Sequence, residues 1–398
     1  MTDRLPWECV ETLPHSDVDM LAGWDAAVAA ANDHAARAHA LVGRALASYW
    51  AVQPEVISDD WDTWRERRRA DVAEAERLAR RAADPDLLAE CLLGRLYALW
   101  GPDDLGTRAP VIAELEALRP SIQDEELRLR VLEWRVLEHL DRGELAEAKD
   151  HIEAFARESA GTELVLLRRR EELWRGNVAM LEGDVDGALQ LNQDAISSTA
   201  DTAGSPFSFQ NVAVTLAIER FLRRGLDDVI EPIRSIRASS PRVAVNWDTA
   251  LAFALSEVGR LEEAAAVFET VAADDFSPVR RDLNWLVVMH LLGLVALHLD
   301  DEPRIRQLLR HLLPFADLDA THGSGYASYG PVGRVVARLE GRCGDAAGGA
   351  ARLERVLATR FAGPWTSLAR LDLADVLRQD EPVSALRHAE QAAAELAT

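Results

Sequence analysis

"VAVNWDTALAFALSEVGRLEEA" (residues 243–264) and "RRDLNWLVVMHLLGLVALHLDDEP" (residues 280–303) each carry the same Asn-Trp pair at the start of an apolar segment. The two tryptophans, Trp247 and Trp285, are 38 residues apart, which is longer than an ordinary helix. In the first stretch, apolar residues keep helical spacing on both sides of Gly259, so two helices joined by a turn are expected there. The recurring pair therefore indicates a repeated unit of two helices.

The same turn recurs along the chain. Glycines that precede the start of a new helix lie at Gly143, Gly183, Gly225, Gly259 and Gly344. Their separations are 40, 42, 34 and 85 residues, and "LDDEPRIRQLLRHLL" from Leu299 supplies the turn that the last interval lacks. Tetratricopeptide repeats and their longer relatives have periods of about 34 to 47 residues. We therefore predict an all-α, tetratricopeptide-like solenoid of about eight or nine helical hairpins, wound as a right-handed superhelix without a sheet.

The length and composition fit a chain with an extended core. The 398 residues are 48% apolar and 28% charged, which is typical of a globular rather than a disordered protein. The first third of the chain shows a similar but less regular pattern. We expect residues 1–20 to form an N-terminal arm or cap, and residues 21–398 to form a single helical-repeat solenoid.

Charge and cysteine content restrict the partners and the compartment. A net charge of −23 repels the phosphates of nucleic acids and of anionic membranes, so neither is expected as a partner. The three cysteines, Cys9, Cys91 and Cys343, are far apart and odd in number, which suits a reducing cytoplasm. The N-terminus has no apolar signal segment, and the most apolar run, residues 285–299, is shorter than a membrane span of roughly 20 residues. We expect a cytoplasmic protein.

Motifs for common chemistry are missing from the sequence. No P-loop, dinucleotide fingerprint, H-E-x-x-H helix or G-x-S-x-G elbow occurs, and Lys149 is the only lysine. His290 and His298 lie on an apolar helix, where they are interpreted as core histidines. The Gly-rich stretch of residues 321–333 is interpreted as a flexible connection between helices. We therefore expect no cofactor and no metal, and the catalytic residues, if there are any, stay unknown.

Aromatic residues occur about once per repeat, near the start of the first helix of each unit. Since first helices line the concave face of such a solenoid, we predict a ligand site there. The predicted site residues are Trp247, Asn284, Trp285, Tyr326 and Tyr329 in the later repeats, with Gln210 and Arg135 on the earlier side. Two alternatives stay open. The aromatic rings are also explained as packing between repeats, and the asparagines as helix caps.

Several stretches in order resemble a known bacterial region. They are "LYALWGPDD" (96–104), "RRDLNWLVVMHLL" (280–292), "LLPFAD" (312–317), "YGPVGRVVARLEGRCGD" (329–345) and "GPWTSLARLDLADVL" (363–377). They are similar to the C-terminal tetratricopeptide-like repeats of large actinobacterial ATPase regulators, which carry a nucleotidyl-cyclase-like domain or a LuxR-type DNA-binding domain. The resemblance implies a sensor or interaction arm. The ATPase, cyclase and DNA-binding parts are not found in this sequence, so their output is not expected.

Two functions follow from these observations. The first is a freestanding, regulatory binding module that recognises a protein, peptide or small molecule in its concave groove. The second is an enzyme of specialised-metabolite biosynthesis, catalysing a cyclisation or rearrangement in an aromatic-lined pocket, because aromatic faces stabilise cations. A closed apolar pocket with convergent titratable groups would favour the enzyme. The sequence does not indicate the oligomeric state.

Overall fold

The chain is almost entirely helical in the computed structural model, which describes residues 5–7, 17–50, 61–197, 206–239, 244–360, 363–378 and 381–396. The prediction of an all-α protein is confirmed, apart from two short strands. The first helices are α1 (Asp17–Ala30), α2 (His34–Trp50), α3 (Trp61–Ala82), α4 (Pro85–Ala98), α5 (Arg108–Leu118), α6 (Glu125–Arg142), α7 (Leu145–Ser159), α8 (Val165–Glu182) and α9 (Val185–Ser197).

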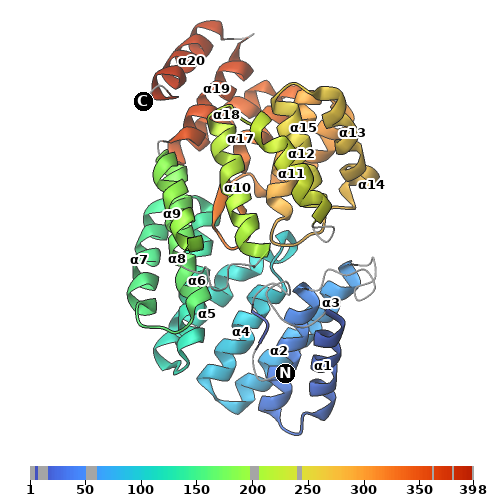
Figure 1. Cartoon of the computed structure of the whole chain (residues 1–398), viewed down its shortest axis with the longest axis vertical. Helices are drawn as coiled ribbons and strands as arrows, with labels where there is room; N and C mark the ends of the chain where they lie inside the picture. Colours follow the sequence, from blue (N-terminus) through green and yellow to red (C-terminus); the bar gives the residue numbers. More distant parts are fainter. Residues whose placement is uncertain are drawn as a thin grey trace.

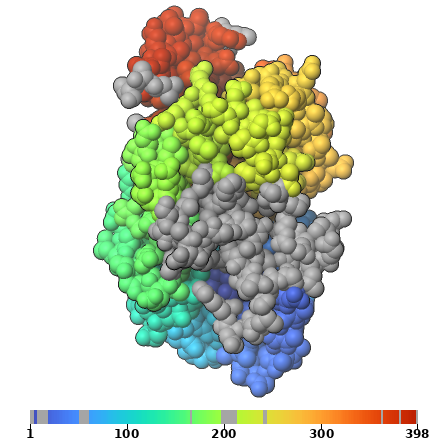
Figure 2. Space-filling view, viewed as in Figure 1, coloured from blue at the N-terminus to red at the C-terminus, as the bar shows by residue number. Residues whose placement is uncertain are grey.

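The second half of the described chain continues the series. Its helices are α10 (Pro206–Leu222), α11 (Asp227–Ser239), α12 (Ala244–Glu257), α13 (Leu261–Val271), α14 (Ala273–Phe276), α15 (Trp285–Leu299), α16 (Glu302–Leu312), α17 (Val332–Arg342), α18 (Ala346–Thr359), α19 (Pro364–Leu377) and α20 (Pro382–Leu396). Short 3-10 turns are η2 (Pro102–Thr107), η3 (Arg119–Ser121) and η6 (Leu313–Phe315). Helices α1 and α20 lie at opposite ends of the long axis (Figure 1), and the sequence colours follow that axis in the space-filling view (Figure 2).

Tight turns join the paired helices where the glycines were expected. Gly143, Gly183, Gly259 and Gly344 have φ values between +66° and +95°, in the left-handed region that glycine adopts without steric cost. The turn at Gly225 differs, because the residue before it, Arg224, takes the left-handed conformation with φ 56°. In the interval without a glycine, Asp300 takes the same role with φ 55°.

A two-stranded antiparallel hairpin interrupts the helices, so the prediction of a fold without a sheet is wrong. Its strands are β1 (Asp319–His322) and β2 (Ala327–Pro331). β1 packs against α6, α15 and α17, and β2 packs against α8, α10 and α19, so the hairpin lies among helices from both halves of the chain (Figure 1). The expected flexible connection at residues 321–333 is therefore an ordered, largely buried element.

The apolar interior forms two large clusters that meet at α6. The N-terminal core runs from Leu5 to Leu137 along the sequence, and the C-terminal core runs from Leu129 to Trp365. Leu5 and Trp7 are buried in the N-terminal core, so the described part of the expected arm is packed against the helices. α1 begins at Asp17, a few residues before the expected end of that arm.

Residues 280–284 connect the two halves a second time, and we call them the bridging segment. Its Leu283 packs against the N-terminal core. The Leu283 backbone N–H donates to the Tyr49 hydroxyl over 3.0 Å, and that hydroxyl donates to the Trp100 carbonyl over 2.6 Å. Gly101 lies so close to the Arg281 carbonyl that a Cβ atom would stand 2.5 Å from it. The bridging segment thus ties the start of α15 to the N-terminal helices.

Candidate functional site: an arginine–aspartate seam

The predicted aromatic site residues are buried. Trp247, Trp285, Tyr326 and Tyr329 are between 2% and 6% exposed and belong to the C-terminal core. The sequence interpretation placed Tyr326 and Tyr329 near the start of a first helix, but both lie in the hairpin. The aromatic ladder is therefore packed in the interior in this structure, as the packing alternative describes.

Two predicted residues lie apart from these rings. Arg135 is on α6, where its Nη1 donates to Glu138 Oε2 over 2.7 Å. Gln210 lies within α10, but its side chain is outside the described residues. Among the described residues, Arg135 makes no hydrogen bond or ion pair with another predicted site residue.

Side chains from two helices hold the backbone of the hairpin tip, which comprises residues 323–325. Asn284 Oδ1 accepts a hydrogen bond from the Gly323 N–H over 2.9 Å. Trp174 Nε1 donates to the Ser324 carbonyl over 2.7 Å, and Asn177 Nδ2 donates to the Gly325 carbonyl over 2.8 Å. Asn284 occupies the N-cap position of α15 but makes no capping hydrogen bond, so the capping alternative is wrong for Asn284. A backbone N–H of the chain itself satisfies its amide oxygen.

Trp285, which follows Asn284, connects the surroundings of the hairpin tip to a network of charged residues. Its ring packs against Phe315, with ring centroids 5.4 Å apart, and the Arg281 guanidinium lies over the same ring at 4.5 Å. Arg281 also donates from Nε and Nη2 to both oxygens of Asp103, at 2.7 to 3.0 Å. Cation–π and paired hydrogen-bond contacts of this kind hold a guanidinium in one orientation.

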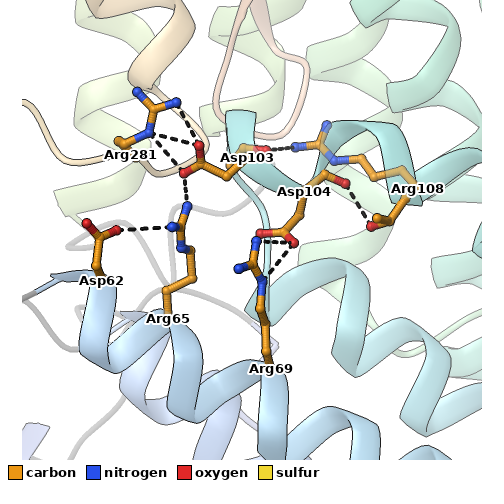
Figure 3. A network of polar contacts seen from close by, with 9 residues as sticks. Asp62, Arg65, Arg69, Asp103, Asp104, Arg108 and Arg281 are labelled. Carbon is orange, nitrogen blue, oxygen red and sulfur yellow. Dashed lines mark hydrogen bonds and ion pairs between the residues drawn. The ribbon is translucent and has the colours of Figure 1, made fainter.

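We call the charged network around Asp103 the Arg–Asp seam (Figure 3). It comprises Asp62, Arg65, Arg69, Asp103, Asp104, Arg108 and Arg281. Arg65 pairs with both Asp62 and Asp103, and Arg69 donates to Asp104 Oδ1 from Nε and Nη2 at 3.1 and 2.7 Å.

The seam is positioned by three elements, and α5 adds its first residue, Arg108, as a fourth. Asp62, Arg65 and Arg69 follow one another along one face of α3, because residues three and four apart are neighbours on a helix. The two aspartates lie in η2, which begins after Gly101 with a proline in its first turn. The third element is the bridging segment, which brings in Arg281. Asp103 and Arg281 are 178 residues apart in sequence, so no local pattern could predict their contact.

Burial shifts the pKa values of charged groups around Arg108, the seam residue on α5. Arg108 donates to the Gly101 carbonyl over 3.1 Å and lies 3.4 Å from Asp141 Oδ2. Burial lowers the pKa of Arg108 and raises the pKa of Asp141 to about 6. Burial also raises the pKa of Asp319, in β1, to about 6, although Arg360 Nε donates to it over 3.0 Å. Asp141 and Asp319 repel each other when both are ionised.

These two carboxyls predict an unusual pH dependence. Because their folded pKa of about 6 exceeds the ordinary 3.8, the folded protein holds more protons than the unfolded chain between these values. Their contribution to the unfolding free energy therefore falls as pH rises from about 4 to about 6. In Asp141→Asn the Asp141 share of this fall is absent, so the variant should gain about 2 kcal/mol relative to wild type between pH 4.5 and 7. Urea unfolding at both pH values measures it.

The matched control is Asp228→Asn, at a carboxylate whose side chain is 70% exposed. Its unfolding free energy should follow wild type at both pH values. If the Asp141→Asn curve also runs parallel to wild type, the pKa of Asp141 is not raised in the folded protein.

Comparisons with known proteins give no family for this chain. No protein-family model matches it, and no curated protein is significantly similar to it. Within the described ranges, no group of three or more His, Cys, Asp or Glu residues could hold a metal ion, and no helix is long and apolar enough to span a bilayer.

Proposed function

We propose that the chain is a freestanding, tetratricopeptide-like binding module, a right-handed superhelix that acts as a regulatory interaction arm in the cytoplasm. Consecutive helices joined by left-handed turns support the repeat architecture. The resemblance to the helical arms of ATPase regulators supports the regulatory role. The ligand is a protein segment, a peptide or a small molecule.

The three hydrogen bonds to the hairpin tip carry this proposal. Trp174, Asn177 and Asn284 bind carbonyl and N–H groups of the turn at residues 323–325, and they do so without using its side chains. Hydrogen bonds to main-chain groups also give affinity in many peptide-recognition domains. The helices already bind one backbone turn of their own chain. We propose that a ligand binds beside it, along the Arg–Asp seam.

Arg281 is the seam residue next to the hairpin tip in this proposal, because its guanidinium lies over the ring of Trp285, the neighbour of Asn284. Its side chain is 33% exposed, whereas the neighbouring Trp285 is 2% exposed. We expect peptides selected from a displayed random library to bind wild type, and Arg281→Ala to weaken their Kd about tenfold or more. Fluorescence anisotropy with a labelled selected peptide measures this change. Arg306→Ala, at a side chain that is 54% exposed, is the control and should bind like wild type.

Two results would count against the module. One is a library without any enriched peptide. The other is a set of enriched peptides whose affinities are the same for wild type and Arg281→Ala.

An enzyme is the second candidate, because one group of side chains has a catalytic composition. His298 Nδ1 lies 3.1 Å from Ser256 Oγ, and His298 Nε2 lies 3.7 Å from Glu257 Oε1. Burial lowers the pKa of His298 to about 4, which keeps the imidazole neutral at pH 7. The Ser256 hydroxyl, however, donates to the Phe253 carbonyl over 2.9 Å, so its proton does not point to the histidine.

A covalent probe separates the two candidates. Ser256 is 4% exposed and its proton is engaged, so we expect no labelling by a fluorophosphonate, which reacts with activated serines. Intact-protein mass spectrometry reads the adduct. A stoichiometric adduct in wild type that is lost in Ser256→Ala would favour the enzyme over the module.

A further inference from the structure

A second group of arginines lies next to the seam, and two N–H-bearing atoms of its central member have no acceptor within the described ranges. Arg68, on α3, is 1% exposed, and its Nε and Nη1 atoms are buried without a hydrogen-bond partner among the described residues. Burial, with Arg280 and Arg65 nearby, lowers the pKa of Arg68 to about 10, so it is still charged at pH 7. Asp104 and Asp282 attract the Arg68 charge without a hydrogen bond to it. Buried N–H donors of a charged group that lack an acceptor cost several kcal/mol, and native proteins rarely leave them so.

The surroundings of Arg68 are aromatic and cationic. Its guanidinium lies 4.2 Å from the Trp61 ring centroid and 5.6 Å from that of Tyr49. Arg280, of the bridging segment, lies over the same Trp61 ring at 4.2 Å. Two guanidinium groups therefore share one indole. This attraction to the ring does not replace an anion, because cation–π contacts contribute only about 0.5–2 kcal/mol.

Around Arg68, there are more hydrogen-bond donors than free acceptors among the described residues. Arg280 Nε and Trp61 Nε1 are also buried without a hydrogen-bond partner in the part of the chain that the structure describes. The Tyr49 hydroxyl is occupied, since it donates to the Trp100 carbonyl and accepts from Leu283. Of the neighbouring carboxylates, Asp282 lies 3.9 Å from Arg280 Nε, and Asp104 is paired with Arg69. Neither carboxylate hydrogen-bonds to Arg68.

We propose that Arg68, Arg280 and the Trp61 indole N–H bind an oxyanion, the phosphate or carboxylate group of a small molecule or side chain. Their unpartnered N–H groups are the donors that guanidinium and indole offer to such oxygens. The Arg280 side chain is 32% exposed and forms the outer edge of this oxyanion site. The inference goes beyond the binding module and does not depend on it, since an anion would bind there whatever the module recognises.

Calorimetric titration of the full chain with inorganic phosphate, at constant ionic strength set with chloride, tests the site. We expect saturable binding to wild type and a rise in Tm with phosphate concentration. Arg68→Met keeps an apolar stem but removes the donors, so it should bind about tenfold or more weakly. Arg306→Met, at an exposed arginine, should bind like wild type. A parallel titration with acetate shows whether the site takes phosphates, carboxylates or both.

Two outcomes would overturn the proposal. One is that neither phosphate nor acetate binds wild type. The other is that Arg68→Met binds as tightly as wild type. If Arg68→Met does not fold, Arg280→Met is the second variant, and unchanged affinity in that variant also overturns the proposal.

Discussion

Trp285→Ala is expected to lower the free energy of unfolding by about 3–5 kcal/mol, the usual cost of removing a large aromatic side chain from a core. The ring is 2% exposed and packs against Phe315 and His311, with centroids 5.4 and 6.3 Å away. Its loss also removes the surface on which the Arg281 guanidinium lies. The substitution should therefore loosen both the C-terminal core and the Arg–Asp seam.

Urea unfolding of Trp285→Ala beside Leu386→Ala measures this effect. Leu386 is 60% exposed, so its truncation should change the unfolding free energy by less than about 0.5 kcal/mol. The opposite pattern would support an open aromatic groove. In that case Trp285→Ala would keep the Tm of wild type and would lose only the binding of a selected peptide.

The helices and their turns could be predicted because their signals are local. Apolar spacing gives the helices, and glycine marks turns where a positive φ is needed, as at Gly143 and Gly344. The position of Asp300 shows the limit of this signal. An aspartate adopts the same backbone conformation there, and only the repeat length indicated that a turn was missing.

The hairpin could not be predicted in the same way. A strand with one buried face shows alternating polar and apolar residues, but β2 is buried along its whole length. Its sequence, "ASYGP", therefore carries no alternation, and the glycines around it are equally typical of a loop. Burial of β2 depends on α8, α10 and α19, which are distant in sequence.

The Arg–Asp seam could not be predicted from the sequence, for a related reason. Of the Asn-Trp pair of residues 284 and 285, Asn284 bonds to the hairpin tip and Trp285 is part of the C-terminal core. The sequence also contains Asp103 and Arg281 in its most characteristic stretches, but nothing in either stretch indicates that they meet. Contacts across 178 residues are set by how the helices of both halves pack together, and only the folded structure contains that information.

Gly325→Ala is expected to cost about 2–5 kcal/mol, because it combines backbone strain with crowding. Gly325 has φ +83°, where a residue with a Cβ atom loses about 1–2 kcal/mol. The added Cβ would also stand 2.8 Å from Leu137 and 3.0 Å from Leu140, both on α6. Overpacking of this kind costs a further 1–3 kcal/mol or so. The substitution should push the hairpin tip away from the helices that hold it.

Gly344→Ala separates the two contributions. Gly344 has φ +94°, but a Cβ atom there would meet nothing within 4 Å, so this variant carries the strain without the crowding. We expect Gly344→Ala to lose about 1–2 kcal/mol and Gly325→Ala to lose clearly more. Native-state hydrogen exchange should show faster exchange at Gly323 and Gly325 in Gly325→Ala alone. Equal losses in the two variants would mean that the hairpin tip does not pack against α6, and the central position of the hairpin would have to be abandoned.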